Sequence, residues 1–188
     1  MATVVTTDLE QARQYFAVTR NRIVEATNGL SDAQAQFKPA ADRWSIAEIL
    51  EHMAGAHERV LARVQKDLPQ APAPEANRNA RLIDSVVVEK IPDRTSRFKA
   101  PEFLAPTGKV SPSDSIERIF HGYASLISFL ESTPDLRGHV LESIPLRAVS
   151  NGTYTTMDGY QWALATAAHD ERHVRQILEV KANSNYPS

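Results

Sequence analysis

Four segments of this chain repeat apolar residues at three- and four-residue intervals, and this pattern restricts the fold more than any other feature. Helix-capping signals begin the segments, as in Ser45-Ile46-Ala47-Glu48, where the hydroxyl and the carboxylate can satisfy free N–H groups reciprocally. Amphipathic helices of this kind must pack against one another to bury their apolar stripes. We therefore predict an all-α four-helix bundle, with helices over residues 7–30, 45–64, 111–130 and from Thr155 or Thr156 to 180.

Two long connections interrupt the bundle. Seven of the 11 prolines lie between Pro69 and Pro112, which excludes one continuous helix there. We predict a short helix over residues 79–90 and an irregular crossover after it; a connection of this length is usually functional or covers a site. In the second connection, Asn151-Gly152 is a strong turn signal, which allows a small hairpin flanked by Val149 and Tyr154 before the last helix. We expect one domain over residues 1–188.

His169 and His173 stand four residues apart in the last helical segment. On an α-helix this spacing places both imidazoles on one face, where they can bind one divalent metal with the help of further ligands. The alternative is a pair of half-buried histidines with ordinary hydrogen bonds. Asp170 falls inside the apolar sector, where its carboxylate requires a partner: an arginine of the first helix, a histidine N–H or water.

A third metal ligand would have to come from another helix. The segment 45–64 carries His52 and His57. Helical periodicity places His57 inside the apolar stripe and His52 on its flank, so periodicity by itself favours His57 as the inward-facing residue. His52, however, shares its flank with the small residues Gly55 and Ala56, which leave room beside the helix.

Composition excludes several classes of function. The net charge is −2 without a dense Lys/Arg run, so we expect no nucleic-acid partner. The chain has no cysteine, so a metal would need N and O ligands, and any thiol must come from outside. No apolar stretch is long enough to span a bilayer, and the N-terminus lacks the pattern of a signal peptide. We therefore expect a cytoplasmic protein with no membrane partner.

Two motifs resemble the helix signatures of the DinB/YfiT-like superfamily of metal-dependent four-helix bundles. The second helical segment carries Trp44-Ser45-Ile46-Ala47-Glu48-x-x-x-His52-Met53. The last carries Tyr160-x-x-x-Leu164-x-x-x-Ala168-His169-x-x-x-His173-x-x-Gln176-Ile177. Ala105-Pro106-Thr107-Gly108 is similar to the connection before the third helix of that family. The resemblance runs from about residue 8 to 182.

The resemblance implies a divalent metal, zinc or nickel, held by His52, His169 and His173, and it replaces His57 with His52 as the third ligand. Three protein ligands leave positions open, as in catalytic sites. Family members with assigned activity include S-transferases and isomerases that use low-molecular-weight thiols, so the implied activity is thiol-dependent S-transfer to a small electrophilic substrate. The same open positions would also suit hydrolysis by hydroxide. Glu48, Arg59 and Asp170 are candidates for contacts behind the ligands, and the alternative for each is an ordinary surface or capping role.

The alternative function is a non-catalytic, stress-associated metal-binding bundle. Because family members often form homodimers through helix faces, the resemblance implies a homodimer under either function.

Overall fold

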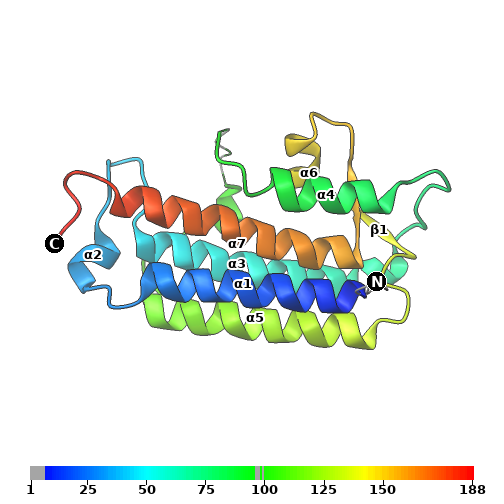
Figure 1. Ribbon diagram of the computed structural model, residues 1–188, viewed down its shortest axis with the longest axis horizontal. Coiled ribbons are helices and arrows are strands. Elements are labelled where there is room, and N and C mark those ends of the chain that lie inside the picture. The colour runs from blue at the N-terminus through cyan, green and yellow to red at the C-terminus, as the bar shows by residue number, and fades with distance from the viewer. Residues whose placement is uncertain (1–6, 96–97, 99) are drawn as a thin grey trace, which may run out of the picture.

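The four predicted helices form a bundle in the computed structural model, which describes residues 7–95, 98 and 100–188 (Figure 1). The all-α prediction is confirmed. In ring order, each neighbouring pair in contact, the bundle helices are α1 (Asp8–Thr27), α7 (Gly159–Lys181), α3 (Ile46–Lys66) and α5 (Pro112–Ser132). The short helix α2 (Asp32–Gln36) follows α1 at the end of the bundle where the chain also ends.

The helix starts follow the predicted capping signals. The side chain of Ser45 accepts a hydrogen bond from the backbone N–H of Glu48, and Glu48 reaches back to the N–H of Ser45. Thr7 and Glu10 form the same reciprocal pair at the start of α1. After α1, Gly29 adopts a φ of +70°, a left-handed conformation that other residues avoid, so the chain can turn away from the helix there.

The long connection between α3 and α5 follows from the direction of these helices. The two are neighbours and run in the same direction, so the chain has to return along the whole bundle between them (Figure 1). The return path contains the 3₁₀ turn η1 (Leu68–Gln70), the helix α4 (Ala80–Lys90) and the 3₁₀ turn η2 (Glu102–Leu104). The predicted helix over 79–90 is thereby confirmed, and α4 lies against α7.

The hairpin prediction was only partly right. Strands β1 (Val140–Glu142) and β2 (Thr156–Asp158) pair antiparallel, but Val149 and Tyr154 are not in strands. A helix that we did not predict, α6 (Ile144–Val149), lies between the strands because Ser143 caps it and Pro145 suits its first turn. The turn at Asn151-Gly152, where both residues have positive φ, follows α6.

The last helix begins later than predicted. Thr156 belongs to β2, and α7 starts at Gly159 with Asp158 as its N-cap. Asp158 and Gln161 form a capping box, so the carboxylate satisfies the first turn from outside the helix.

The core lies between the four bundle helices. Phe16 of α1 and Tyr123 of α5 stack with their ring centroids 4.9 Å apart. The largest fully buried apolar side chains include Ile23, Ile46, Ile49, Leu50, Met53, Ile119, Leu126 and Ile177. None of the helices in the described ranges combines the length and the apolarity needed to cross a membrane.

Candidate metal centre

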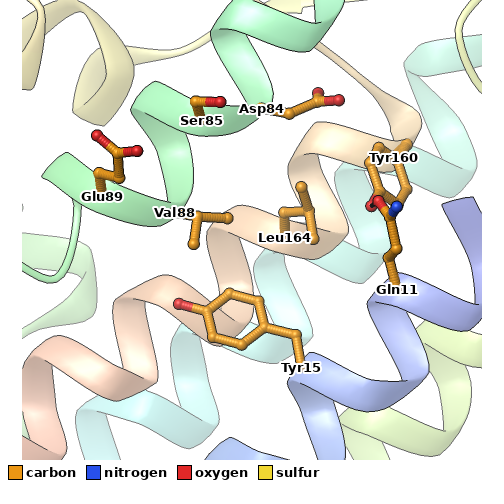
Figure 2. Close-up of a pocket in the computed structure, with 8 residues that line it drawn as sticks. All are labelled: Gln11, Tyr15, Asp84, Ser85, Val88, Glu89, Tyr160 and Leu164. Carbon is orange, nitrogen blue, oxygen red and sulfur yellow. Dashed lines mark hydrogen bonds between the residues drawn. The ribbon is translucent and has the colours of Figure 1, made fainter. Parts of the chain in front are cut away.

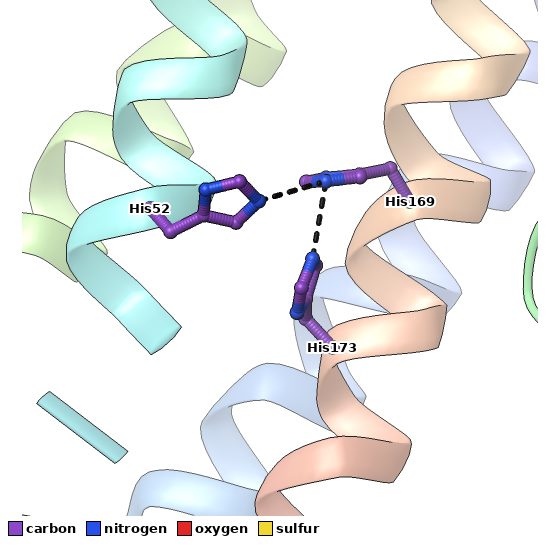
Figure 3. A group of neighbouring side chains, drawn as sticks. All are labelled: His52, His169 and His173. Carbon is purple, nitrogen blue, oxygen red and sulfur yellow. Dashed lines mark hydrogen bonds between the residues drawn. The ribbon is translucent and has the colours of Figure 1, made fainter. Parts of the chain in front are cut away.

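His52, His169 and His173 converge on one point between α3 and α7, and Figure 3 shows their Nε2 atoms facing one another. The Nε2 atom of His169 lies 3.2 Å from that of His52 and 3.1 Å from that of His173. The three side chains each offer one ligand atom, and these atoms all lie within 4.8 Å of one another. The structure thus brings together the three residues that the resemblance implied.

Two of the three rings have their Nδ1 atoms fixed by acceptors. The Nδ1–H of His52 donates to the backbone carbonyl of Leu104 at 2.8 Å, and that of His173 donates to Oε1 of Gln176 at 2.9 Å. Arg94 Nη1 also donates to this Oε1, at 3.2 Å, which identifies the atom as the amide oxygen. With the proton on Nδ1, the lone pair of each Nε2 points into the cluster.

Burial keeps these two rings neutral. Burial and the nearby His169 together lower the pKa of His52 to about 4. Burial and the same neighbour hold the pKa of His173 well below its usual value. The His52 and His173 residues are 5% and 7% exposed, whereas 28% of the His169 side chain is exposed. Neutral imidazole nitrogens suit a divalent metal of borderline softness, and the exposed side of His169 leaves room for another ligand.

Comparison with known protein families shows which family this chain belongs to. The family model of the DinB superfamily matches residues 15–177. The chain belongs to the DinB superfamily. It is also similar to the uncharacterized protein YuaE of Bacillus subtilis (strain 168), with 25% identity over 153 residues, which cover 81% of this chain and 86% of YuaE.

In this DinB-superfamily protein, His57 does not take part in the three-histidine cluster. It is fully buried, as its periodicity predicts. Its Nε2–H donates to Oδ2 of Asp170 at 2.6 Å, and the hydroxyl of Tyr123 donates to the same oxygen. Burial alone would raise the pKa of Asp170. The charge of His57 and the hydrogen bonds that the Asp170 carboxylate receives outweigh burial and lower this pKa to about 2.

This network answers the question of which group partners Asp170. Of the three partners that the sequence left open, the histidine N–H is present. Tyr123 was missed because it belongs to α5, which the sequence does not place relative to α7. Oδ1 of Asp170 accepts no hydrogen bond in the described structure and lies 3.7 Å from Nδ1 of His169, the third histidine of the cluster.

The crossover after α4 contacts the surroundings of the histidine cluster at two points. One point is Leu104 of η2, whose carbonyl holds His52. The next residues are fixed by Glu51: its carboxylate accepts from Thr107 N at 3.0 Å, from Thr107 Oγ1 at 2.6 Å and from Gly108 N at 2.8 Å. Glu51 thereby anchors the chain beside Leu104.

The second point is Arg94, which binds Gln176 behind His173. Arg94 forms two parallel hydrogen bonds with Glu179, at 2.6 Å from Nε and 2.7 Å from Nη2. Its neighbours are held to α7 as well, because Arg172 donates to the carbonyl of Asp93 and Arg175 to that of Pro92. The start of the crossover is therefore tied to the helix that carries two of the histidines.

The remaining candidates have other partners. Glu48 completes its capping box and accepts from Lys38 Nζ at 2.6 Å. Arg59 stacks on Phe103, with its Cζ atom 4.0 Å from the ring centroid. Trp44, which precedes the N-cap residue of α3, contacts His52, with ring centroids 4.9 Å apart.

A hollow lies between α1, α4 and α7, with a volume of about 340 Å³ (Figure 2). Tyr160 and Leu164 contribute to its lining, and at 100° per residue they lie about 140–180° around α7 from His169. Asp84, one of two carboxylates that line it, accepts hydrogen bonds from Arg137 and Gln161. The hollow is therefore separate from the histidine cluster.

Proposed function

We propose that this DinB-superfamily protein is a metal-dependent enzyme in which His52, His169 and His173 hold one zinc or nickel ion. We further propose that it transfers a low-molecular-weight thiol to a small electrophile. The observation that carries the proposal is the directed donor set: three Nε2 atoms share one point, and the Nδ1–H groups of His52 and His173 are fixed by other acceptors. A cation at this point could accept a lone pair from each of the three Nε2 atoms.

When bound, such a metal would supply a Lewis acid with open positions, which favours the thiolate form of a thiol at neutral pH. The protein residues bind and orient the reactants. The exposed side of His169 is the route by which a thiol would enter. In the transfer, the thiol sulfur forms a bond to the electrophilic carbon, the leaving group departs with its bonding electrons, and the thiol proton passes to solvent.

The carboxylates near the cluster favour a thiol over water as the nucleophile. The four within four residues of the histidines already have partners: Glu48 binds Lys38, Glu51 binds Thr107, Asp170 binds His57 and Glu171 binds Arg22. Attack by water benefits from a general base held near the nucleophile. A thiol loses its proton far more readily than water, so it depends less on such a base.

Three further statements stay predictions: residues 1–188 form one domain, the protein is cytoplasmic, and it forms a homodimer. Val24 of α1 and Leu178 of α7 are exposed apolar residues on neighbouring helices, and a dimer would bury such a face. Light scattering of the purified protein measures the dimer prediction directly.

The test of the proposed function compares metal content with thiol consumption. Native protein and the variants His52→Ala, His169→Ala and His173→Ala are analysed for bound metal, with His121→Ala as a control because His121 is an exposed histidine of α5. Each protein is then incubated with 1-chloro-2,4-dinitrobenzene and a panel of small thiols. We expect about one metal per chain and thiol-dependent turnover in the native protein and the control, and neither in the three variants. Bound metal without turnover for any thiol would favour the non-catalytic alternative.

A further inference from the structure

Two arginines continue the line of His52 along α3. Arg59 and Arg63 follow His52 by seven and eleven residues, so at 100° per residue they lie within about 20° of its direction on the helix. The rise of the helix places Arg59 about 10 Å and Arg63 about 16 Å from His52 along the axis. Both therefore lie on the face of α3 that carries the metal-ligand candidate.

Aromatic rings from the surroundings of the cluster hold both guanidinium groups. Arg59 Cζ lies 4.0 Å from the ring centroid of Phe103, the residue before Leu104, whose carbonyl binds His52. Arg63 Cζ lies 4.9 Å from the ring centroid of Trp162. Stacking on a ring uses the face of a guanidinium and leaves its N–H groups, which lie in the plane, free to donate.

Neither arginine has an acidic partner among the residues that the structure describes. The carboxylates of α3 nearest to them are committed, because Glu58 binds Arg118 and Glu51 binds Thr107 and Gly108. A third donor stands beside them: Nε1 of Trp162 is buried, and no acceptor lies within hydrogen-bond distance in the described structure. Trp162 precedes His169 by seven residues, so it occupies the corresponding line on α7.

We propose that Arg59, Arg63 and Trp162 bind the carboxylate end of a ligand whose other end reaches the three-histidine centre. The planar fork of a guanidinium matches a carboxylate, and a buried indole N–H gains an acceptor it lacks in the free protein. This inference rests on the proposed function, to which it adds the charge of the substrate or cosubstrate and a separation of about 10 Å between its two ends.

The test measures binding of two thiols of equal length to the metal-loaded protein. 8-Mercaptooctanoate carries a carboxylate about 10 Å from its sulfur in the extended form, and 8-mercapto-1-octanol carries a hydroxyl there. We expect the carboxylate to bind about tenfold more tightly, as charge-assisted hydrogen bonds would give. A short pair, 3-mercaptopropionate and 3-mercapto-1-propanol, should show no such preference because its carboxylate does not reach Arg59.

The variants Arg59→Gln and Arg63→Gln should each reduce the preference to less than about threefold without changing the affinity for the mercapto-alcohol or the metal. Arg20→Gln is the matched control. Arg20 also stacks on a ring, 4.6 Å from Phe120, and has no acidic partner in the described structure, but it lies on α1. The control should keep the full preference.

Equal binding of the two eight-carbon thiols would overturn the inference and leave the proposed function intact. If Arg59→Gln weakened the metal or the mercapto-alcohol equally, Arg59 would only hold η2 through Phe103, and the inference would again be overturned. If no thiol bound, the thiol step of the proposed function would fail. In that case suberate against octanoate decides the inference, because the second carboxylate should still gain affinity that Arg59→Gln removes.

Discussion

His57 and Asp170 form a hydrogen bond of 2.6 Å between two side chains that are completely buried. The hydroxyl of Tyr123 donates to the same carboxylate oxygen, so the network joins α3, α5 and α7. Asp170 is the residue after His169. The network therefore fixes the rotation of α7 at the point where this helix presents His169 to His52.

This network predicts opposite phenotypes for two histidines of the same helix. His57→Leu should lower the unfolding free energy of the metal-free protein by about 3 kcal/mol, because it removes an N–H donor from the buried carboxylate of Asp170. The folded fraction should still bind metal. His52→Gln should abolish metal binding and change the unfolding free energy of the metal-free protein by less than about 1 kcal/mol. Urea unfolding and elemental analysis measure the two properties separately.

A double variant controls for this first prediction. Adding Asp170→Asn to His57→Leu removes the unpaired charge, so stability should recover in part. If His57→Leu were as stable as the native protein, the two buried side chains would not form a coupled pair.

The second prediction concerns Gln176, which orients His173. Gln176→Leu removes the acceptor of the Nδ1–H and should weaken metal binding about 10- to 100-fold, as measured by competition with a chromogenic chelator. Arg94→Met removes the hydrogen bond that holds the Gln176 amide, so the amide can rotate. Because Arg94 does not contact His173 itself, this variant should weaken metal binding less than Gln176→Leu. Arg118→Met breaks an ion pair with Glu58 elsewhere and should leave the affinity unchanged. A full-affinity Gln176→Leu variant would mean that His173 orients itself.

The bundle and the His169–His173 pair could be predicted from the sequence because each rests on local signals. The capping box at Ser45 and the periodicity after it are sufficient to place α3. The choice of His52 over His57 was not local: both rings are buried, and only the packing of α3 against α5 and α7 separates them. There the resemblance to a family supplied what periodicity could not.

The partners behind the histidines could not be predicted for the same reason. Leu104 binds His52 through its backbone carbonyl, which any residue would offer, so the side chain gives no signal. Arg94 and Gln176 are 82 residues apart, and their contact depends on how the crossover returns over α7. The helix α6 was missed because the Asn151-Gly152 turn suggested a tight hairpin, while Ser143 and Pro145 carried the helix signal.

The third prediction tests the close approach of α5 to α3. A Cβ atom added at Gly122 would lie 2.9 Å from Cβ of His57 and 3.0 Å from its Cγ, so the two helices have to separate. Gly122→Ala should therefore lower the unfolding free energy by about 1–3 kcal/mol, despite the better helix propensity of alanine. Gly55→Ala is the control, because the same atom there meets only Leu104, at 3.8 Å. Thermal unfolding of the two variants makes the comparison.

The fourth prediction is a pH dependence at the start of α1. Burial raises the pKa of Asp8, but hydrogen bonds from Arg137 and Arg81 outweigh burial and bring it below its ordinary 3.8. A lowered folded-state pKa contributes stability above the unfolded pKa, and this contribution is lost as the pH falls through the folded value. Asp8→Asn should cost about 1 kcal/mol at pH 7 and progressively less below about pH 4. Asp42→Asn, which removes a carboxylate without an ion pair in the described structure, should show no such trend.

The last prediction concerns removal of the metal. A cation that binds the three imidazoles of the folded chain stabilises it by mass action, by about 2.7 kcal/mol when its concentration is a hundredfold above its dissociation constant. Chelation should therefore lower the melting temperature, and zinc or nickel should restore it, whereas magnesium should not because it prefers oxygen ligands. His52→Ala and His169→Ala should melt at the same temperature with and without zinc. If these variants responded to zinc as the native protein does, the ion would be bound elsewhere, and the convergence of the three rings would need another explanation.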